Sequence, residues 1–167
     1  MIGRGEVLDR LKKGTHHGAD GSDPVASGIG KSGRVGFSWS VRVYYEDTDL
    51  GGVVYHANYL RFMERARTEW LRTLGFEQDV LREQHGVQFV VVGAKLEFTR
   101  PARFNDELKV SVSVKERGRA SLVFAQEIRL SAGHTRICSG EMRVACVDIG
   151  NFKPCPLPKA ILAELDA

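Results

Sequence analysis

The stretch that decides the fold is Tyr44-Tyr45-Glu46-Asp47-Thr48-Asp49-Leu50-Gly51-Gly52-Val53-Val54-Tyr55-His56-Ala57-Asn58-Tyr59. Residues 38–45, which overlap the beginning of this stretch, alternate apolar and polar side chains, and this pattern predicts a strand with one buried face. Within the stretch, the carboxylates Glu46, Asp47 and Asp49 come just before the Gly51-Gly52 pair, a combination typical of a tight turn. The chain is therefore expected to pass from a strand through an acidic turn into a helix.

The helix after this turn is predicted over residues 58–74, because apolar residues recur there at intervals of three and four. Asn58 is the expected N-cap, and Gly75 is expected to end the helix. At about 1.5 Å per residue, the helix is roughly 25 Å long and can cross a sheet. The predicted buried stripe consists of Tyr59, Phe62, Met63, Ala66, Trp70, Leu71 and Leu74.

The second half of the chain changes to a period of two, after a short helix expected over residues 77–84. Strands are predicted over residues 87–99, 107–117, 120–131 and 134–148, and a terminal helical turn over residues 159–165. Breaks at Gly118 and at Ala132-Gly133 predict hairpins between antiparallel strands. The predicted fold class is α+β, with one long helix wrapped by a curved antiparallel sheet. Strand edges left open in such a sheet favour a homo-oligomer.

The N-terminal part of the chain differs in composition from the rest. Residues 1–36 hold half of the chain's 18 glycines and little aliphatic periodicity, so we expect a disordered extension. Residues 37–167 then form one globular domain. No apolar run reaches the roughly 18 residues of a transmembrane helix, and residues 1–13 lack the apolar core of a secretory signal.

Charge and cysteine content narrow the function classes. The net charge is +3 and basic residues are scattered, which does not favour nucleic-acid binding. Cys138, Cys146 and Cys155 are an odd number at wide spacing, so they predict neither a disulfide framework nor a CxxC metal site. This number and spacing of cysteines favours a reducing compartment, and we expect a cytoplasmic protein.

The acidic turn is the candidate catalytic site. An aspartate near a helix start can act as a nucleophile or general base, and free N–H groups there can stabilise an oxyanion. Gly51 and Gly52 leave room for an extended substrate to approach the backbone. These parts suit acyl transfer to water without a metal. The alternative is ordinary turn chemistry, in which the aspartates only accept hydrogen bonds; this is the preferred interpretation for Asp47.

Other residues have open roles. His56 can act through its backbone N–H, through its imidazole, or through both, or can merely cap and pack. Tyr55 and Tyr59 are expected to be core or pocket walls. Arg117-Gly118-Arg119-Ala120-Ser121 places two cations and a hydroxyl on one hairpin, which suits the phosphates of a nucleotide-bearing substrate or a solvated hairpin tip.

Residues 41–72, which contain Asp-Thr-Asp-Leu-Gly-Gly-Val-Val-Tyr-His-Ala-Asn-Tyr, resemble the signature of the hotdog-fold acyl-CoA thioesterases. The resemblance is to the 4-hydroxybenzoyl-CoA thioesterase type, and most closely to its Tol-Pal system-associated branch. It continues through residues 101–106 and 153–158, and it covers residues 38–165. His56 stands where the benzoyl-specific branch has Tyr, so an aromatic acyl group is not implied.

The resemblance implies a five-stranded antiparallel sheet around a helix, in protomers that pair edge to edge as homodimers or homotetramers with active sites at the dimer interface. It implies Asp49 as the catalytic carboxylate and the His56 backbone N–H as the group that activates the thioester carbonyl. The implied substrate-binding residues are Gly51, Gly52, Val53, Tyr55 and Tyr59, with Arg117, Arg119 and Ser121 at the coenzyme A nucleotide.

The function expected from residues and resemblance together is hydrolysis of an acyl-CoA thioester to a free acid and coenzyme A. Asp49 either attacks the carbonyl, which gives a mixed anhydride, or activates water as a general base. No cofactor or metal is implied. The alternative functions are a non-catalytic scaffold that binds acyl thioesters or an acyl carrier protein in envelope maintenance, and a hotdog dehydratase or hydratase.

Overall fold

The computed structural model describes residues 36–166, so the N-terminal extension predicted from the sequence lies outside the described residues up to residue 35. Its elements in chain order are β1 (Phe37–Arg42), the 3-10 turn η1 (Tyr45–Asp47), α2 (Asn58–Thr73), α3 (Gln78–His85), β2 (Val87–Phe98), β3 (Glu107–Arg117), β4 (Ser121–Leu130), β5 (Arg136–Asp148) and α4 (Lys159–Asp166). None of the helices between residues 36 and 166 is long and apolar enough to span a membrane.

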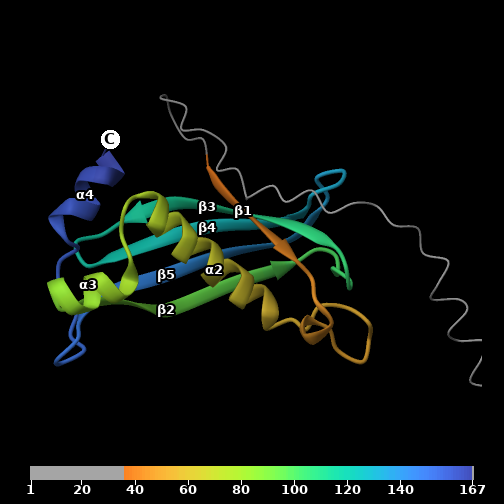
Figure 1. Ribbon diagram of the computed structural model, residues 1–167, viewed down its shortest axis with the longest axis horizontal. Coiled ribbons are helices and arrows are strands. Elements are labelled where there is room, and N and C mark those ends of the chain that lie inside the picture. Colours follow the sequence, from red (N-terminus) through yellow and green to blue (C-terminus); the bar gives the residue numbers. More distant parts are fainter. Residues whose placement is uncertain (1–35, 167) are drawn as a thin grey trace, which may run out of the picture. The chain divides into compact units, whose positions relative to one another are not determined.

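The five strands form one sheet in the order β1-β3-β4-β5-β2, and every neighbouring pair is antiparallel. The strands β1 and β2 are therefore the two edges. Helix α2 crosses one face of this sheet, with the acidic loop at one end of the helix and α3 and α4 towards the other (Figure 1). The predicted α+β layout of one long helix against a five-stranded antiparallel sheet is confirmed.

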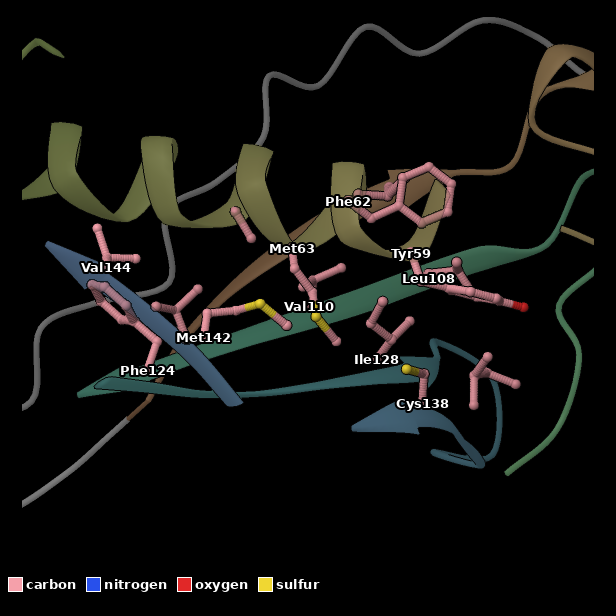
Figure 2. Packing of buried hydrophobic residues seen from close by; sticks show 14 of the residues in the cluster. Tyr59, Phe62, Met63, Leu108, Val110, Phe124, Ile128, Cys138, Met142 and Val144 are labelled. Carbon is pink, nitrogen blue, oxygen red and sulfur yellow. The ribbon is translucent and has the colours of Figure 1, made fainter. Parts of the chain in front are cut away.

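The core lies between α2 and the concave face of the sheet. Phe62, Met63 and Ala66 of α2 are fully buried, as the helical spacing of the apolar stripe predicts. Alternate residues of β3 and β4 meet them, because side chains one residue apart in a strand point to opposite faces. Figure 2 shows this packing around Tyr59, Phe62, Met63, Leu108, Val110, Phe124, Ile128, Cys138, Met142 and Val144.

Two sequence predictions at the start of the domain are wrong. The first strand ends at Arg42 and not at Tyr45, because the chain turns into η1 and leaves Tyr45 81% exposed. Asn58 is not the N-cap: Ala57 holds that position, and no side chain caps the helix. The Asn58 side chain instead donates from Nδ2 to the Asp47 carbonyl oxygen at 3.0 Å.

Candidate active site

The acidic stretch forms a small hairpin between β1 and α2. Thr48 and Val54 make an antiparallel bridge. On either side of it the Asp49 N–H donates to the Val53 carbonyl at 3.0 Å, and the Tyr55 N–H donates to the Asp47 carbonyl at 2.9 Å. The hairpin therefore projects Asp49 at its tip and returns the chain directly to the start of α2.

The tip of this hairpin depends on its two glycines. The Gly52 N–H donates to the Asp49 carbonyl at 2.9 Å, and Gly52 has a φ of 69°, where a side chain would be strained. A Cβ added at Gly51 would lie 3.0 Å from Oδ1 of Asp49. The first glycine thus keeps the space beside the carboxylate open, and the second allows the turn.

The Asp49 carboxylate is exposed and only partly engaged. Its Oδ1 accepts the Gly51 N–H at 2.8 Å, which fixes the orientation of the side chain. Its Oδ2 has no hydrogen-bond partner among residues 36–166. One oxygen is therefore held by the turn while the other is available to a substrate or a water molecule.

Asp47 has a different environment. It is 4% exposed, and its Oδ2 accepts the Tyr44 N–H at 2.9 Å. Its carbonyl oxygen accepts hydrogen bonds from the Tyr55 N–H and the Asn58 side chain. These bonds agree with the structural role in the turn that the sequence favours for Asp47.

His56 lies between this hairpin and the helix, and its side chain is exposed. Helix α2 begins two residues later, at Asn58, and the Asn58 N–H donates to the Tyr55 carbonyl at 2.8 Å. Within residues 36–166, the His56 N–H donates to no acceptor. The imidazole stacks obliquely on Tyr55, with ring centroids 4.3 Å apart. His56 thus offers an unused backbone donor just before the positive end of a helix dipole.

Tyr59 lies in the core and not on the loop surface. It is 3% exposed, and its hydroxyl oxygen accepts the Ala102 N–H at 3.0 Å. Burial raises the pKa of Tyr59, against the opposing effect of the Ala102 hydrogen bond. Tyr59 therefore anchors the first turn of α2 in the core, and its hydroxyl group is already hydrogen-bonded to Ala102.

The Arg117–Ser121 hairpin lies at the other end of the sheet. Arg42 at the end of β1 pairs with Glu107 at the start of β3. With 11 residues in β3, at about 3.3 Å each, Arg117 is roughly 30 Å from that point. The acidic loop follows β1, so one chain does not bring the hairpin together with Asp49.

The hairpin contacts the C-terminal segment instead. An Arg117 guanidinium nitrogen lies 2.5 Å from an Asp166 carboxylate oxygen of α4. The Arg119 carbonyl accepts the Leu157 N–H at 3.0 Å, while the Arg119 side chain is exposed. A Cβ at Gly118 would lie 2.8 Å from the Ser121 hydroxyl oxygen, so a larger residue there would force the Ser121 side chain to move.

A groove and a cavity run along α2, and the sequence reasoning missed both. The open groove, of about 520 Å³, is lined by Leu60, Arg61, Glu64, Arg65, Arg67, Val91, Ala94 and Met142. A smaller cavity of about 90 Å³ shares Glu64, Arg67 and Val91 with it and extends to Trp70, Phe124 and Ile161. The groove starts in the first turn of α2, next to the His56 turn, but neither hollow is lined by Asp49.

Arg67 borders both hollows. Its guanidinium donates to Oε1 of the buried Gln126 at 2.7 Å, and the Gln126 amide donates to the Met63 carbonyl at 3.1 Å. Burial lowers the pKa of Arg67 from its usual value. The helical spacing predicts an apolar face and a polar face for α2. It does not predict the Arg67–Gln126 hydrogen bond, because Gln126 lies 59 residues away in the sequence.

Comparisons with known proteins identify the family of this chain. The family model described as "Thioesterase-like superfamily" matches residues 43–165. Acyl-CoA thioesterase YbgC of Haemophilus influenzae is 48% identical over 128 residues, which cover 77% of this chain and 93% of that protein.

Solved structures are similar to this fold over most of its length. A probable thioesterase from Bartonella henselae is 33% identical, covers 74% of this chain and 100% of its own, and has a TM-score of 0.70. A 1,4-dihydroxy-2-naphthoyl-CoA thioesterase from Synechocystis has a TM-score of 0.74 at 22% identity, over 78% of this chain and 96% of its own, which shows the fold alone. The chain therefore belongs to the thioesterase-like superfamily, and its fold is the hotdog fold.

Proposed function

We propose that this chain hydrolyses acyl-CoA thioesters to a free acid and coenzyme A, with Asp49 as nucleophile or general base and the His56 N–H as oxyanion donor. The observation that carries the proposal is the hairpin itself. It holds a half-engaged Asp49 carboxylate at its tip and leads into an unused backbone donor before α2. The relatives named as acyl-CoA thioesterases support the choice of substrate.

Two chemical routes start from the same groups. In the first, the free Asp49 oxygen attacks the thioester carbon, the thiolate of coenzyme A leaves, and water then hydrolyses the mixed anhydride. In the second, Asp49 takes a proton from water while that water attacks the carbonyl, and the tetrahedral intermediate then breaks its C–S bond and releases the thiolate of coenzyme A. Negative charge grows on the carbonyl oxygen in both, so both require the His56 N–H and the nearby end of the α2 dipole.

The acyl chain is proposed to lie in the groove along α2. The groove begins at Leu60, one turn beyond the proposed oxyanion donor, and continues between α2 and Val91 of β2. A chain whose thioester lies at His56 can thus extend along the helix. The adjoining cavity, lined largely by aromatic and aliphatic side chains, then receives the distal carbons of longer chains.

A second copy of the chain is proposed to complete the site. Within residues 36–166, the edge strand β2 has 12 residues, pairs only with β5, and exposes Val91, Val92 and Phe98. Long apolar edges of this kind favour strand pairing. An antiparallel two-fold pairing of β2 with β2 sets opposite ends of the two sheets side by side. The partner's Arg117–Ser121 hairpin then approaches the Asp49 end and meets the nucleotide of coenzyme A.

Replacing Asp49 by Asn tests the catalytic carboxylate. Asp49→Asn keeps an oxygen for the Gly51 N–H but can neither attack as a carboxylate nor accept a proton, so kcat is expected to fall about 100- to 10,000-fold. Free-thiol release from short and long acyl-CoAs measures this effect. Glu46→Gln, an exposed carboxylate of the same loop, is the matched control and is expected to keep its turnover. Equal turnover in a folded Asp49→Asn protein would contradict the proposal.

Two substitutions at His56 distinguish the role of its backbone N–H from the role of its imidazole. His56→Ala keeps the N–H, whereas His56→Pro removes it without breaking any hydrogen bond seen in residues 36–166. Loss of one oxyanion donor is expected to lower kcat about 100- to 1000-fold in the Pro variant, and the Ala variant should lose far less. Circular dichroism and thermal melting check that both variants fold. Similar losses in both would assign the role to the imidazole instead.

Mixed dimers test whether the site is shared. Asp49→Asn chains and Arg117→Ala/Arg119→Ala chains carry different tags, are co-expressed, and are purified through both tags. If the hairpin serves the partner's Asp49, one of the two sites is intact, and roughly half of the wild-type kcat/KM returns. If each chain uses its own hairpin, both sites are damaged and activity stays low. Failure to isolate a doubly tagged species would contradict the dimer.

A further inference from the structure

Two cysteines that lie apart in the sequence meet in the fold. Cys146 belongs to β5, and Cys155 belongs to the segment that returns along β5 before α4. Their sulfur atoms are 3.6 Å apart, and the Cys155 N–H donates to the Cys146 carbonyl at 3.0 Å. Cys146 is buried, whereas Cys155 is half-buried.

The backbone between them has the geometry of paired antiparallel strands. Val147 and Pro154 form an antiparallel bridge, and on its other side the Asp148 N–H donates to the Lys153 carbonyl at 3.0 Å. Cys146 and Cys155 therefore face each other directly across the pair. Such residues have Cα atoms about 5.5 Å apart, which lies within the range of disulfides. The sulfurs need to approach by about 1.5 Å to reach bonding distance.

We propose that Cys146 and Cys155 are an oxidation site that a peroxide converts into a disulfide within one chain. The Cys155 sulfur attacks the peroxide, whose O–O bond breaks, and becomes a sulfenic acid while one water leaves. The Cys146 sulfur then attacks the Cys155 sulfur, the S–O bond breaks, and the departing hydroxide takes the Cys146 proton as a second water. Two thiols lose two electrons and two protons, and one hydrogen peroxide is reduced.

The order of these steps follows from exposure. Burial, together with the Cys155 hydrogen bond, raises the pKa of Cys146 to about 12, so Cys146 stays protonated until it resolves the sulfenic acid. The more exposed Cys155 therefore meets the oxidant first. Cys138 is buried in the main core, where desolvation raises the pKa of its thiol to about 11, and its sulfur contacts no other thiol among residues 36–166. Cys138 is therefore the control cysteine, which is expected to remain a free thiol.

The Cys146–Cys155 disulfide would crosslink β5 to the segment before α4, and both contact the Arg117–Ser121 hairpin. The Cys146 N–H donates to the Ala120 carbonyl at 2.9 Å, and beyond Cys155 the Leu157 N–H donates to Arg119. Closing this short loop is expected to raise the melting temperature by about 5 °C. A functional effect through Arg119 rests on the proposed function, whereas formation of the bond does not.

The test oxidises the full-length protein with hydrogen peroxide, alkylates remaining thiols under denaturing conditions, and measures intact and peptide masses. The expected product has lost two hydrogens, joins the Cys146 and Cys155 peptides, leaves Cys138 alkylated, and reverts with dithiothreitol. Cys138→Ser should form the same bond, while Cys155→Ser and Cys146→Ala should not. Three alkylated thiols, oxidation of Cys155 to a sulfinic acid without a crosslink, or a bond between chains would overturn the proposal. These masses do not depend on thioesterase activity, so the two proposals fail separately.

Discussion

Asp47 ties the end of β1 to the start of α2, and the geometry of the whole loop depends on this connection. Its carboxylate accepts the Tyr44 N–H, and its carbonyl accepts both the Tyr55 N–H and the Asn58 amide. Each bond is worth only about 1 kcal/mol. Together, however, they place the hairpin tip, the His56 turn and the first helical residue relative to one another. A buried aspartate thus positions the exposed one.

The second constraint is the length of the strands. An antiparallel sheet of strands with ten or more residues keeps its two ends roughly 30 Å apart. The acidic loop lies at one end, and the basic hairpin and α4 lie at the other (Figure 1). In the proposed function, an acyl-CoA that needs both a carboxylate and cations therefore takes them from two copies of the chain. The open edge of β2 gives the copies a way to pair.

Much of the fold was predictable from local patterns, and the site only in part. Period-two runs located β2 to β5, and helical spacing located α2, because burial of one face leaves a regular trace in the sequence. The structural role favoured for Asp47 agrees with its hydrogen bonds, whereas the choice of Asp49 as the catalytic carboxylate came from the family resemblance and stays a prediction. The Asn58 cap prediction failed because the helix begins at Asn58 itself, and the Asn58 amide nitrogen donates to the Asp47 carbonyl across the loop. The meeting of Cys146 with Cys155 and the groove along α2 depend on tertiary packing, for which the spacing of residues holds no signal.

The most direct test of the proposed catalytic geometry is a crystal structure of the Asp49→Asn variant with an intact acyl-CoA. The account predicts the thioester carbonyl oxygen about 3 Å from the His56 backbone nitrogen, and the substituted side chain at position 49 beside the carbonyl carbon. It also predicts the acyl chain along α2. A thioester bound away from the hairpin, or a carbonyl oxygen that meets no backbone N–H before α2, would contradict it.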